Sequence, residues 1–333
     1  MRLKPAGILV ILLVIGVLGY FAVKPRLDAL RQENSTELSN TTKSQSETTH
    51  NAEQPSGTKA TTADEREFNY TPEDPVNGQL RGVVEVGATG FNSFVINMDN
   101  QNRWKIVSKD FGESLAYEGL ATTEDIRLGL KRYLSAMFDK GVDKRNMHFV
   151  ISSGAQKEPK TTTISNELKK MGYVVNNVTP DQEARFALRA TVPPPFADNS
   201  FMVDIGSGNT KVSWQDGETT RTLELPGAKY YEKGVSDEEV YSQVKSGIGK
   251  VPENKRNVCF IIGGVPFTLA KQHRKGEERY TVLRNAASYT AKDKKMGAGL
   301  NIYKAIEDAT ATDTFVFDWD ANFTIGFLLG LRK

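Results

Sequence analysis

The sequence has little of the residue types on which metal and nucleophile chemistry usually depends. Cys259 is the only cysteine, and the three histidines, His50, His148 and His273, lie far apart in the chain. One cysteine excludes an internal disulfide, a cysteine-rich zinc site and an iron–sulfur cluster. Three scattered histidines give little material for a histidine-based triad or metal site. Any hydrolytic chemistry is therefore expected to rest on carboxylates.

The chain also lacks a strong excess of charge of either sign. Its 43 Lys and Arg residues against 41 Asp and Glu residues leave a net charge of +2 at pH 7. Sequence-independent binding of nucleic acid needs a concentrated basic surface, so no nucleic-acid partner is expected. The 333 residues are 38% hydrophobic and 25% charged, which is typical of a folded protein with a buried core.

The N-terminal region contains an uninterrupted apolar run. Residues 6–23 carry no charge, and Arg2, Lys4, Lys24 and Arg26 flank them. Such a run is long enough to cross a bilayer, so residues 1–31 are predicted to be a membrane anchor that enters the lipid bilayer through residues 6–23. A cleaved signal peptide is the alternative, but the small-residue site at 17–19 lies inside the apolar run.

A polar segment follows the predicted anchor. Residues 32–67 are dominated by Ser, Thr, Asn, Gln and Glu, a composition that cannot repay the entropy of folding. We therefore predict a disordered tether over residues 32–77. The flanking charges of the anchor are nearly balanced, but the short N-terminal flank and the long polar tether favour a folded part outside the cytoplasm.

The remaining chain is predicted to form two α/β domains, 78–195 and 196–333, separated at a proline-rich segment that suits neither a helix nor a central strand. Helices are expected over residues 124–140 with Thr123 as N-cap, behind Thr179, behind Ser236, and over residues 322–331. Strands are expected at residues 82–86, 93–98, 104–108, 147–152, 173–178, 201–205, 211–214 and 257–262.

The most informative feature is an internal repeat. The segments VEVGATG at 84–90 and VDIGSGN at 203–209 share an apolar, acidic, apolar, glycine pattern, about one domain length apart. Such hairpin turns let backbone N–H groups approach a phosphate, and the carboxylates Glu85 and Asp204 could hold a divalent cation or a water beside it. The alternative is two tight hairpins that use glycine only to turn. The predicted phosphate-binding residues are Gly87, Ala88 and Thr89 in the first loop and Gly206, Ser207, Gly208, Asn209 and Thr210 in the second.

Residues 85–91 also resemble the first phosphate loop of the exopolyphosphatase and guanosine pentaphosphate phosphatase (Ppx/GppA) family, within the actin, hexokinase and Hsp70 superfamily. The resemblance covers roughly residues 82–330, and it implies two RNase H-like domains of the actin-like ATPase type that face each other across a phosphate-holding cleft. It continues in order through residues 117–120, 123–140, 150–153, 182–185, 204–210, 225–228 and 262–264.

The resemblance also implies roles for the carboxylates. Glu183 matches the base that activates the attacking water, and Asp204 and Glu85 match the acidic positions that would orient Mg²⁺ or a water. The residues agree with this, because Glu183 lies in the first turn of the predicted helix behind Thr179, whose positive end would face an anion. A solvated first-turn glutamate is the alternative. The implied substrate is polyphosphate or a nucleotide polyphosphate such as a guanosine polyphosphate.

Three positions depart from the family pattern. Glu85 stands where the family has aspartate, and Gln156 stands where it has arginine, with Lys157 as a weaker substitute. Lys211 replaces a glutamate, a charge reversal that could bind phosphate directly but also removes a carboxylate. Two hypotheses result: a membrane-tethered phosphoanhydride hydrolase, or a phosphate- or nucleotide-binding module that has lost turnover and acts as a sensor or assembly partner. A homodimer is left open.

Overall fold

The computed structural model describes residues 68–87, 91–112 and 123–331. All of them belong to one unit, Ala60–Lys333. The predicted anchor at residues 1–31 and the tether up to residue 67 lie outside the described residues. Within the part of the chain that is described, no helix has the length and apolar character needed to cross a membrane.

The first half of this unit is built on a five-stranded sheet with the order β3-β2-β1-β4-β5. An antiparallel meander comes first, and two parallel strands then extend the sheet beside β1. The strands are β1 (Gln79–Val86), β2 (Phe91–Met98), β3 (Trp104–Gly112), β4 (Met147–Ile151) and β5 (Val175–Asn177). Helices α2 (Thr123–Asp139) and α3 (Pro159–Lys170) pack on this sheet through one apolar stripe each.

The second half is built on a six-stranded sheet with the order β10-β11-β9-β6-β7-β8. Without β10, the strands repeat the order and directions of the first sheet, so the prediction of two related α/β halves is confirmed. The strands are β6 (Ser200–Ile205), β7 (Asn209–Asp216), β8 (Thr219–Pro226), β9 (Val258–Gly263), β10 (Tyr280–Val282) and β11 (Thr314–Asp318). Its helices are α5 (Asp237–Ile248), α6 (Gly264–Ala270) and α7 (Lys294–Thr310).

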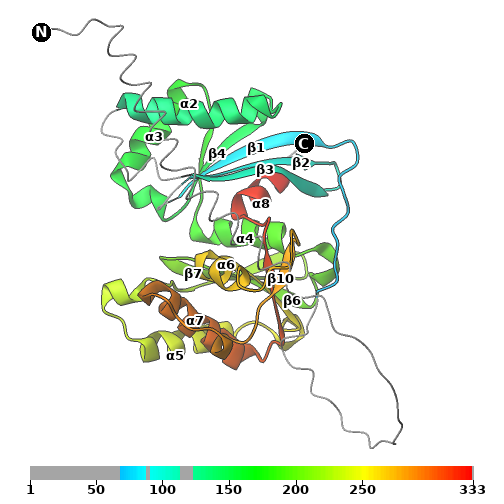
Figure 1. Ribbon diagram of the computed structural model, residues 1–333, viewed down its shortest axis with the longest axis vertical. Coiled ribbons are helices and arrows are strands. Elements are labelled where there is room, and N and C mark those ends of the chain that lie inside the picture. The colour runs from blue at the N-terminus through cyan, green and yellow to red at the C-terminus, as the bar shows by residue number, and fades with distance from the viewer. Residues whose placement is uncertain (1–67, 88–90, 113–122, 332–333) are drawn as a thin grey trace, which may run out of the picture. The chain divides into compact units, whose positions relative to one another are not determined.

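Two helices lie between the sheets (Figure 1), and each packs against the sheet of the half to which it does not belong in sequence. Helix α4 (Pro180–Thr191) follows the first sheet in sequence but packs against β6, β7 and β8. Helix α8 (Phe323–Leu329) follows the second sheet but packs against β1 and β2. The two helices also contact each other, and Gly326 permits this because a Cβ there would overlap the Phe186 carbonyl oxygen. Each half therefore completes the core of the other.

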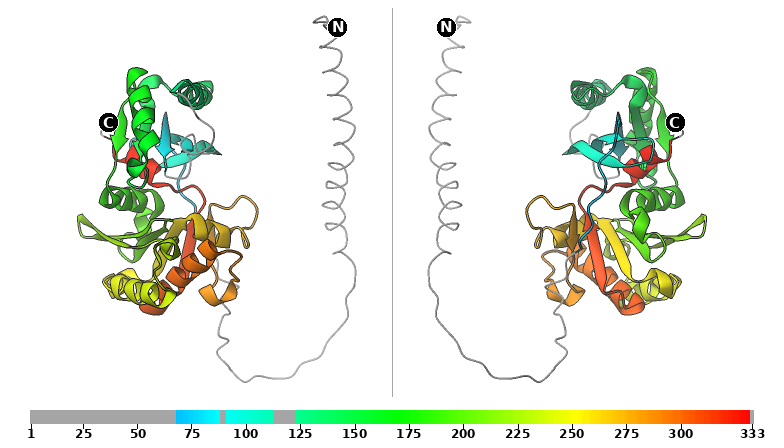
Figure 2. Two further views of the ribbon diagram at one scale, coloured as in Figure 1. Left: turned by 90° about the vertical axis from the view of Figure 1, so that its left-hand side faces the viewer. Right: turned by 90° about the vertical axis from the view of Figure 1, so that its right-hand side faces the viewer.

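The remaining helices cover the faces of the sheets that point away from α4 and α8 (Figure 2). Short 3₁₀ turns connect several elements, namely η2 (Lys144–Asn146), η3 (Ala155–Lys157), η4 (Pro194–Phe196), η5 (Tyr230–Lys233), η6 (Glu253–Lys255) and η7 (Ala286–Ser288). The proline-rich segment that the sequence placed at the domain boundary contains η4 and links α4 to β6.

Residues 68–77 were assigned to the tether, yet their aromatic side chains pack onto the second half. The rings of Phe68 and Tyr70 lie 5.3 and 6.0 Å from that of Tyr280, and both also contact Phe196. The polar stretch ends just before these two residues, and burial of two aromatic rings stabilises an ordered segment.

Candidate functional site

The two acidic residues of the repeat occupy equivalent positions. Glu85 and Asp204 are the next-to-last residues of β1 and β6, the first strand of each sheet. Each faces the second strand of its meander, where Glu85 pairs with Asn92 and Asp204 pairs with Lys211. The repeat therefore places a carboxylate at the end of a central strand in each half, as predicted, with a polar neighbour that differs between the halves.

Glu183 is brought to the second carboxylate by helix α4. Thr179 caps this helix, and its hydroxyl accepts a hydrogen bond from the Gln182 N–H while the Gln182 side chain accepts one from the Thr179 N–H. This confirms the predicted capping box. The cap fixes where the helix begins, so Glu183 lies in its first turn with a residue exposure of only 2%.

Strand β7 presents Lys211 to the start of α4. Ser213 lies two residues further along the strand and therefore on the same face, and its hydroxyl donates to the Ala184 carbonyl at 3.0 Å. The Lys211 ammonium lies 2.8 Å from Glu183 Oε2 and 3.9 Å from Asp204 Oδ2. Lys211 thus lies between Glu183 and Asp204, two of the three carboxylates that the sequence predicted to be catalytic.

Both carboxylate oxygens of Glu183 have partners. The Ser153 N–H, just beyond β4, donates to Oε1 at 2.5 Å, and Lys211 donates to Oε2. The side chains of Glu183 and Lys211 are 3% and 10% exposed. Glu183 is therefore a buried, ion-paired carboxylate and not the solvated first-turn residue that was its alternative interpretation.

Burial and charge shift the pKa values of the surrounding groups. Burial alone would lower the pKa of Lys211, but the Asp204 and Glu183 carboxylates outweigh it and hold that pKa above its usual range. Burial raises the pKa of Asp204, against the opposing effect of the Lys211 ammonium. Lys211 is therefore charged at neutral pH.

Glu85 has a different environment from Asp204. Its Oε2 accepts hydrogen bonds from Asn92 Nδ2 at 2.8 Å and from Asn322 Nδ2 at 3.1 Å. Burial raises the pKa of Glu85, and these two hydrogen bonds offset part of that effect. Asn322 is also the N-cap of α8, since its Oδ1 accepts from the Thr324 N–H at 2.8 Å.

The two crossing helices thus deliver polar groups in a related way. Helix α4 brings Glu183 to the Asp204 carboxylate of the second half, and the start of α8 brings Asn322 to the Glu85 carboxylate of the first half. Sequence reasoning missed Asn92, Asn322 and Ser153. Asn92 could have been found, because its spacing from Glu85 equals that of Lys211 from Asp204.

The second loop is closed on one side by the segment that follows β8. Gly206 N–H donates to the Asn209 carbonyl at 3.1 Å, which makes a tight turn between β6 and β7. The carbonyl oxygens of Gly206 and Ser207 accept from the N–H groups of Ala228 and Lys229 at 2.9 and 3.0 Å. Two carbonyl groups that would repel an anion are therefore held by the protein, as an anion-binding turn requires.

The side chains of this loop are partly committed to the protein. The Thr210 hydroxyl donates to the Pro226 carbonyl at 2.8 Å, and the Asn209 amide donates to Glu224 at 2.7 Å. Ser207 is half-buried and Gly208 is exposed. Any contact from this loop to a phosphate would therefore come mainly from the backbone and Ser207.

Other predicted site residues divide into two groups. In the first loop, Gly87 follows β1 directly, whereas Ala88 and Thr89 lie outside the described residues. Gln156, at the family's arginine position, donates through Nε2 to the Val178 carbonyl at 2.7 Å and so joins the segments after β4 and β5. Neighbouring Lys157 is exposed.

The donor set does not fit the Mg²⁺ that the family resemblance implies. A divalent cation between Glu183 and Asp204 would compete with the Lys211 ammonium for the same oxygens. Glu85 accepts from two amide groups. Over residues 68–87, 91–112 and 123–331, no group of three or more His, Cys, Asp and Glu side chains is arranged to hold a metal ion.

The described unit shares its fold with solved structures of Ppx/GppA proteins. A Ppx/GppA family member from Aquifex aeolicus superimposes with a TM-score of 0.59 at 17% identity, over 76% of this chain and 97% of that chain. An exopolyphosphatase from Cytophaga hutchinsonii gives a TM-score of 0.58 at 14% identity, over 76% of this chain and 99% of that chain. The sequence matches no protein-family model and no curated protein. At these identities the likeness shows a shared two-domain α/β fold.

Proposed function

We propose that this protein binds the terminal phosphates of polyphosphate or of a nucleotide polyphosphate, and that it has lost efficient hydrolysis. The observation that carries the proposal is the buried ion pair between Lys211 and Glu183. The glycine-rich loop remains in place, but Glu183, which matches the base of the family pattern, is paired with the Lys211 ammonium.

Phosphate binding is supported by the second loop. The turn at residues 206–209 has two carbonyl oxygens tied back to the following segment, and its tip is exposed. Lys211, on the strand that leaves this loop, adds a positive charge to the site, and that charge is paired with Glu183. Glycine-rich turns with free backbone N–H groups and a nearby cation are a recurrent means of holding phosphate.

Loss of turnover follows from the state of Glu183. A general base must accept a proton from a water within hydrogen-bond reach. Glu183 Oε2 already accepts from an ammonium and Oε1 from the Ser153 N–H, and the side chain is almost completely buried.

The test combines binding with turnover on the full-length chain in detergent. Calorimetry with inorganic tripolyphosphate is expected to show binding, while phosphate release stays near background in wild type and in Glu183→Gln. Absence of tripolyphosphate binding by the folded chain would sink the proposal.

Hydrolysis is the second candidate, because Glu85, Glu183 and Asp204 interact electrostatically within a fold shared with an exopolyphosphatase. If it is correct, wild type releases phosphate and Glu183→Gln lowers the rate by about 10² to 10⁴, the usual contribution of a general base. In that case Lys211→Glu, which restores the family's carboxylate, should raise the rate further.

We also propose that residues 6–23 anchor the chain in a membrane with the folded unit outside the cytoplasm, on the sequence features given above. This placement favours polyphosphate or another exported phosphate compound over cytosolic nucleotides. Protease added to intact spheroplasts should then cut between residues 32 and 67 and release the folded unit. Complete protection, with cleavage after lysis, would place the unit in the cytoplasm.

A further inference from the structure

The position of Lys211 also affects whether a metal ion can bind between Glu183 and Asp204. Its ammonium is within hydrogen-bond distance of Glu183 and within ion-pair distance of Asp204, and the residue as a whole is 8% exposed. The backbone of Lys211 is held in β7 between its ladder neighbours β6 and β8. Departure of the ammonium would leave the buried carboxylate of Glu183 and the partly buried carboxylate of Asp204 without this cation.

We infer that the Lys211 ammonium takes the place of a divalent cation between Glu183 and Asp204, so that this site carries its own cation and excludes a metal. An ammonium and a divalent cation would bind the same carboxylate oxygens and would repel each other at this distance. Three N–H donors let the ammonium satisfy more than one acceptor.

Glu85, the third carboxylate of the predicted site, also faces nitrogen donors of the chain. Glu85 directs Oε2 toward the amide groups of Asn92 and Asn322, which come from β2 and from the start of α8. Its position opposite Asn92 repeats that of Asp204 opposite Lys211. In each half, then, a nitrogen donor of the chain faces the strand-end carboxylate.

The inference concerns the site of the proposed function, but its test measures metal binding without any phosphate compound, so either can fail alone. Mn²⁺ serves as the probe, because its electron paramagnetic resonance signal separates free from bound ion. Five full-length chains are compared in detergent, with circular dichroism to check the fold: wild type, Asp204→Asn, Lys211→Gln, Lys211→Glu, and Lys211→Glu combined with Asp204→Asn.

Wild type is expected to show only the weak background of surface-bound Mn²⁺, whereas Lys211→Gln, which removes the ammonium without adding a carboxylate, should bind Mn²⁺ above that background. Lys211→Glu, which replaces the ammonium by a third carboxylate, should gain one site with an affinity about 10- to 100-fold above that background. The added Asp204→Asn substitution should remove it.

Two outcomes would overturn the inference. One is a Mn²⁺ site in wild type that Asp204→Asn abolishes, because a metal would then bind beside Asp204 while the Lys211 ammonium is present. The other is a folded Lys211→Glu chain without a new site, since residue 211 would then not be what excludes the metal.

Discussion

The Lys211–Glu183 pair is a buried ion pair whose two members come from different halves of the unit. Burial of two charges costs several kcal/mol per ion, and the pair recovers this only while both members are present. Ser153 and Asp204 supply the further contacts that such a pair needs. The pair is therefore better evidence for a fixed geometry at the site than for net stability.

Removal of one partner should reveal this dependence. Lys211→Met is expected to lower the free energy of unfolding by about 3 to 5 kcal/mol, because Glu183 is then buried without its cation. The double variant Lys211→Met, Glu183→Gln should recover most of the loss. Urea unfolding of the four chains in a double-mutant cycle measures the coupling. Additive losses would show that the two side chains do not depend on each other.

The Glu85 carboxylate should make the free energy of unfolding depend on pH, because its pKa is raised in the folded state. Burial raises its folded-state pKa above the ordinary value of 4.5, so the folded state takes up a proton before the unfolded state does as pH falls. Ionised Glu85 therefore destabilises the fold above its raised pKa, and this cost disappears as pH falls toward 4.5.

Glu85→Gln removes the partly buried charge and keeps one oxygen to accept from Asn92 and Asn322. The variant should unfold at a higher temperature than wild type at pH 8, and the difference should shrink toward pH 5. Thermal unfolding at both pH values measures it, with Glu224→Gln on the exposed part of β8 as a control. An equal difference at both pH values would mean that the effect is not due to the charge of Glu85.

At the scale of elements, the second loop depends on Gly227. A Cβ at this buried position would overlap the Asn209 N–H and would lie 2.7 Å from the Ser207 carbonyl oxygen, so the turn would have to move. We expect Gly227→Ala to weaken tripolyphosphate binding about tenfold, or ~1.4 kcal/mol. Gly249→Ala is the matched control, since its Cβ would make ordinary contacts at 3.5 Å. Unchanged affinity in a folded Gly227→Ala chain would show that this turn does not bind the phosphates.

The starts of two helices were predicted from a few neighbouring residues. The capping box at Thr179 and the N-cap at Ser236 are confirmed, because a side chain and a backbone N–H three residues apart suffice to define them. Thr123 is the first residue of α2 and not its N-cap. Strand β8 was not predicted, because it is a half-exposed edge strand with several polar residues. Strand β11 was not predicted either, because periodicity alone cannot distinguish a short apolar run from a buried helical segment.

At the scale of the whole unit, the sequence predicted two related halves but not the exchange of helices between them. The contact of Glu183 with Lys211 and that of Asn322 with Glu85 both depend on this exchange. No local pattern encodes it, because it arises from the packing of α4 and α8 between the sheets. The candidate residues were therefore predictable one by one, while their pairing was not.

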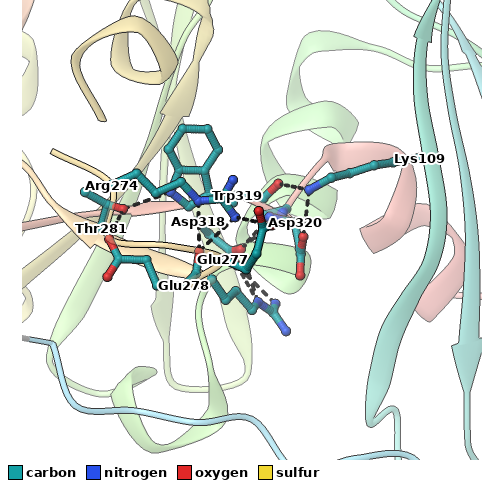
Figure 3. A network of polar contacts seen from close by, with 10 residues as sticks. Lys109, Arg274, Glu277, Glu278, Thr281, Asp318, Trp319 and Asp320 are labelled. Atoms are coloured by element: carbon teal, nitrogen blue, oxygen red, sulfur yellow. Dashed lines mark hydrogen bonds and ion pairs between the residues drawn. The ribbon is translucent and has the colours of Figure 1, made fainter. Parts of the chain in front are cut away.

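The segment that leads from β11 to α8 is held by a network of polar contacts (Figure 3). Asp318 forms a two-point ion pair with Arg279 at 3.0 and 3.1 Å and accepts from the Asp320 N–H at 2.9 Å. The Arg279 guanidinium lies 4.2 Å from the centre of the Trp104 ring on β3, which belongs to the first half. This network therefore connects both halves just before Asn322 reaches Glu85.

A second ion pair bridges the halves at the same place but is more exposed. Lys109 of β3 donates to the Trp319 carbonyl and to Asp320, each at 3.0 Å, and the two charged side chains are 30% and 25% exposed. Exposed pairs contribute little, whereas loss of one partner of a buried pair is costly. The two pairs thus offer a matched comparison.

Asp318→Asn should therefore lower the free energy of unfolding by about 3 to 5 kcal/mol, because it leaves the Arg279 guanidinium without its counter-charge. The Asn side chain still offers an oxygen to the Asp320 N–H, so the loss is electrostatic and the turn itself is kept. Lys109→Met should cost less than about 1 kcal/mol. Chemical unfolding of both variants measures the difference, and equal costs would mean that the segment entering α8 is held by its exposed side and not by the buried carboxylate of Asp318.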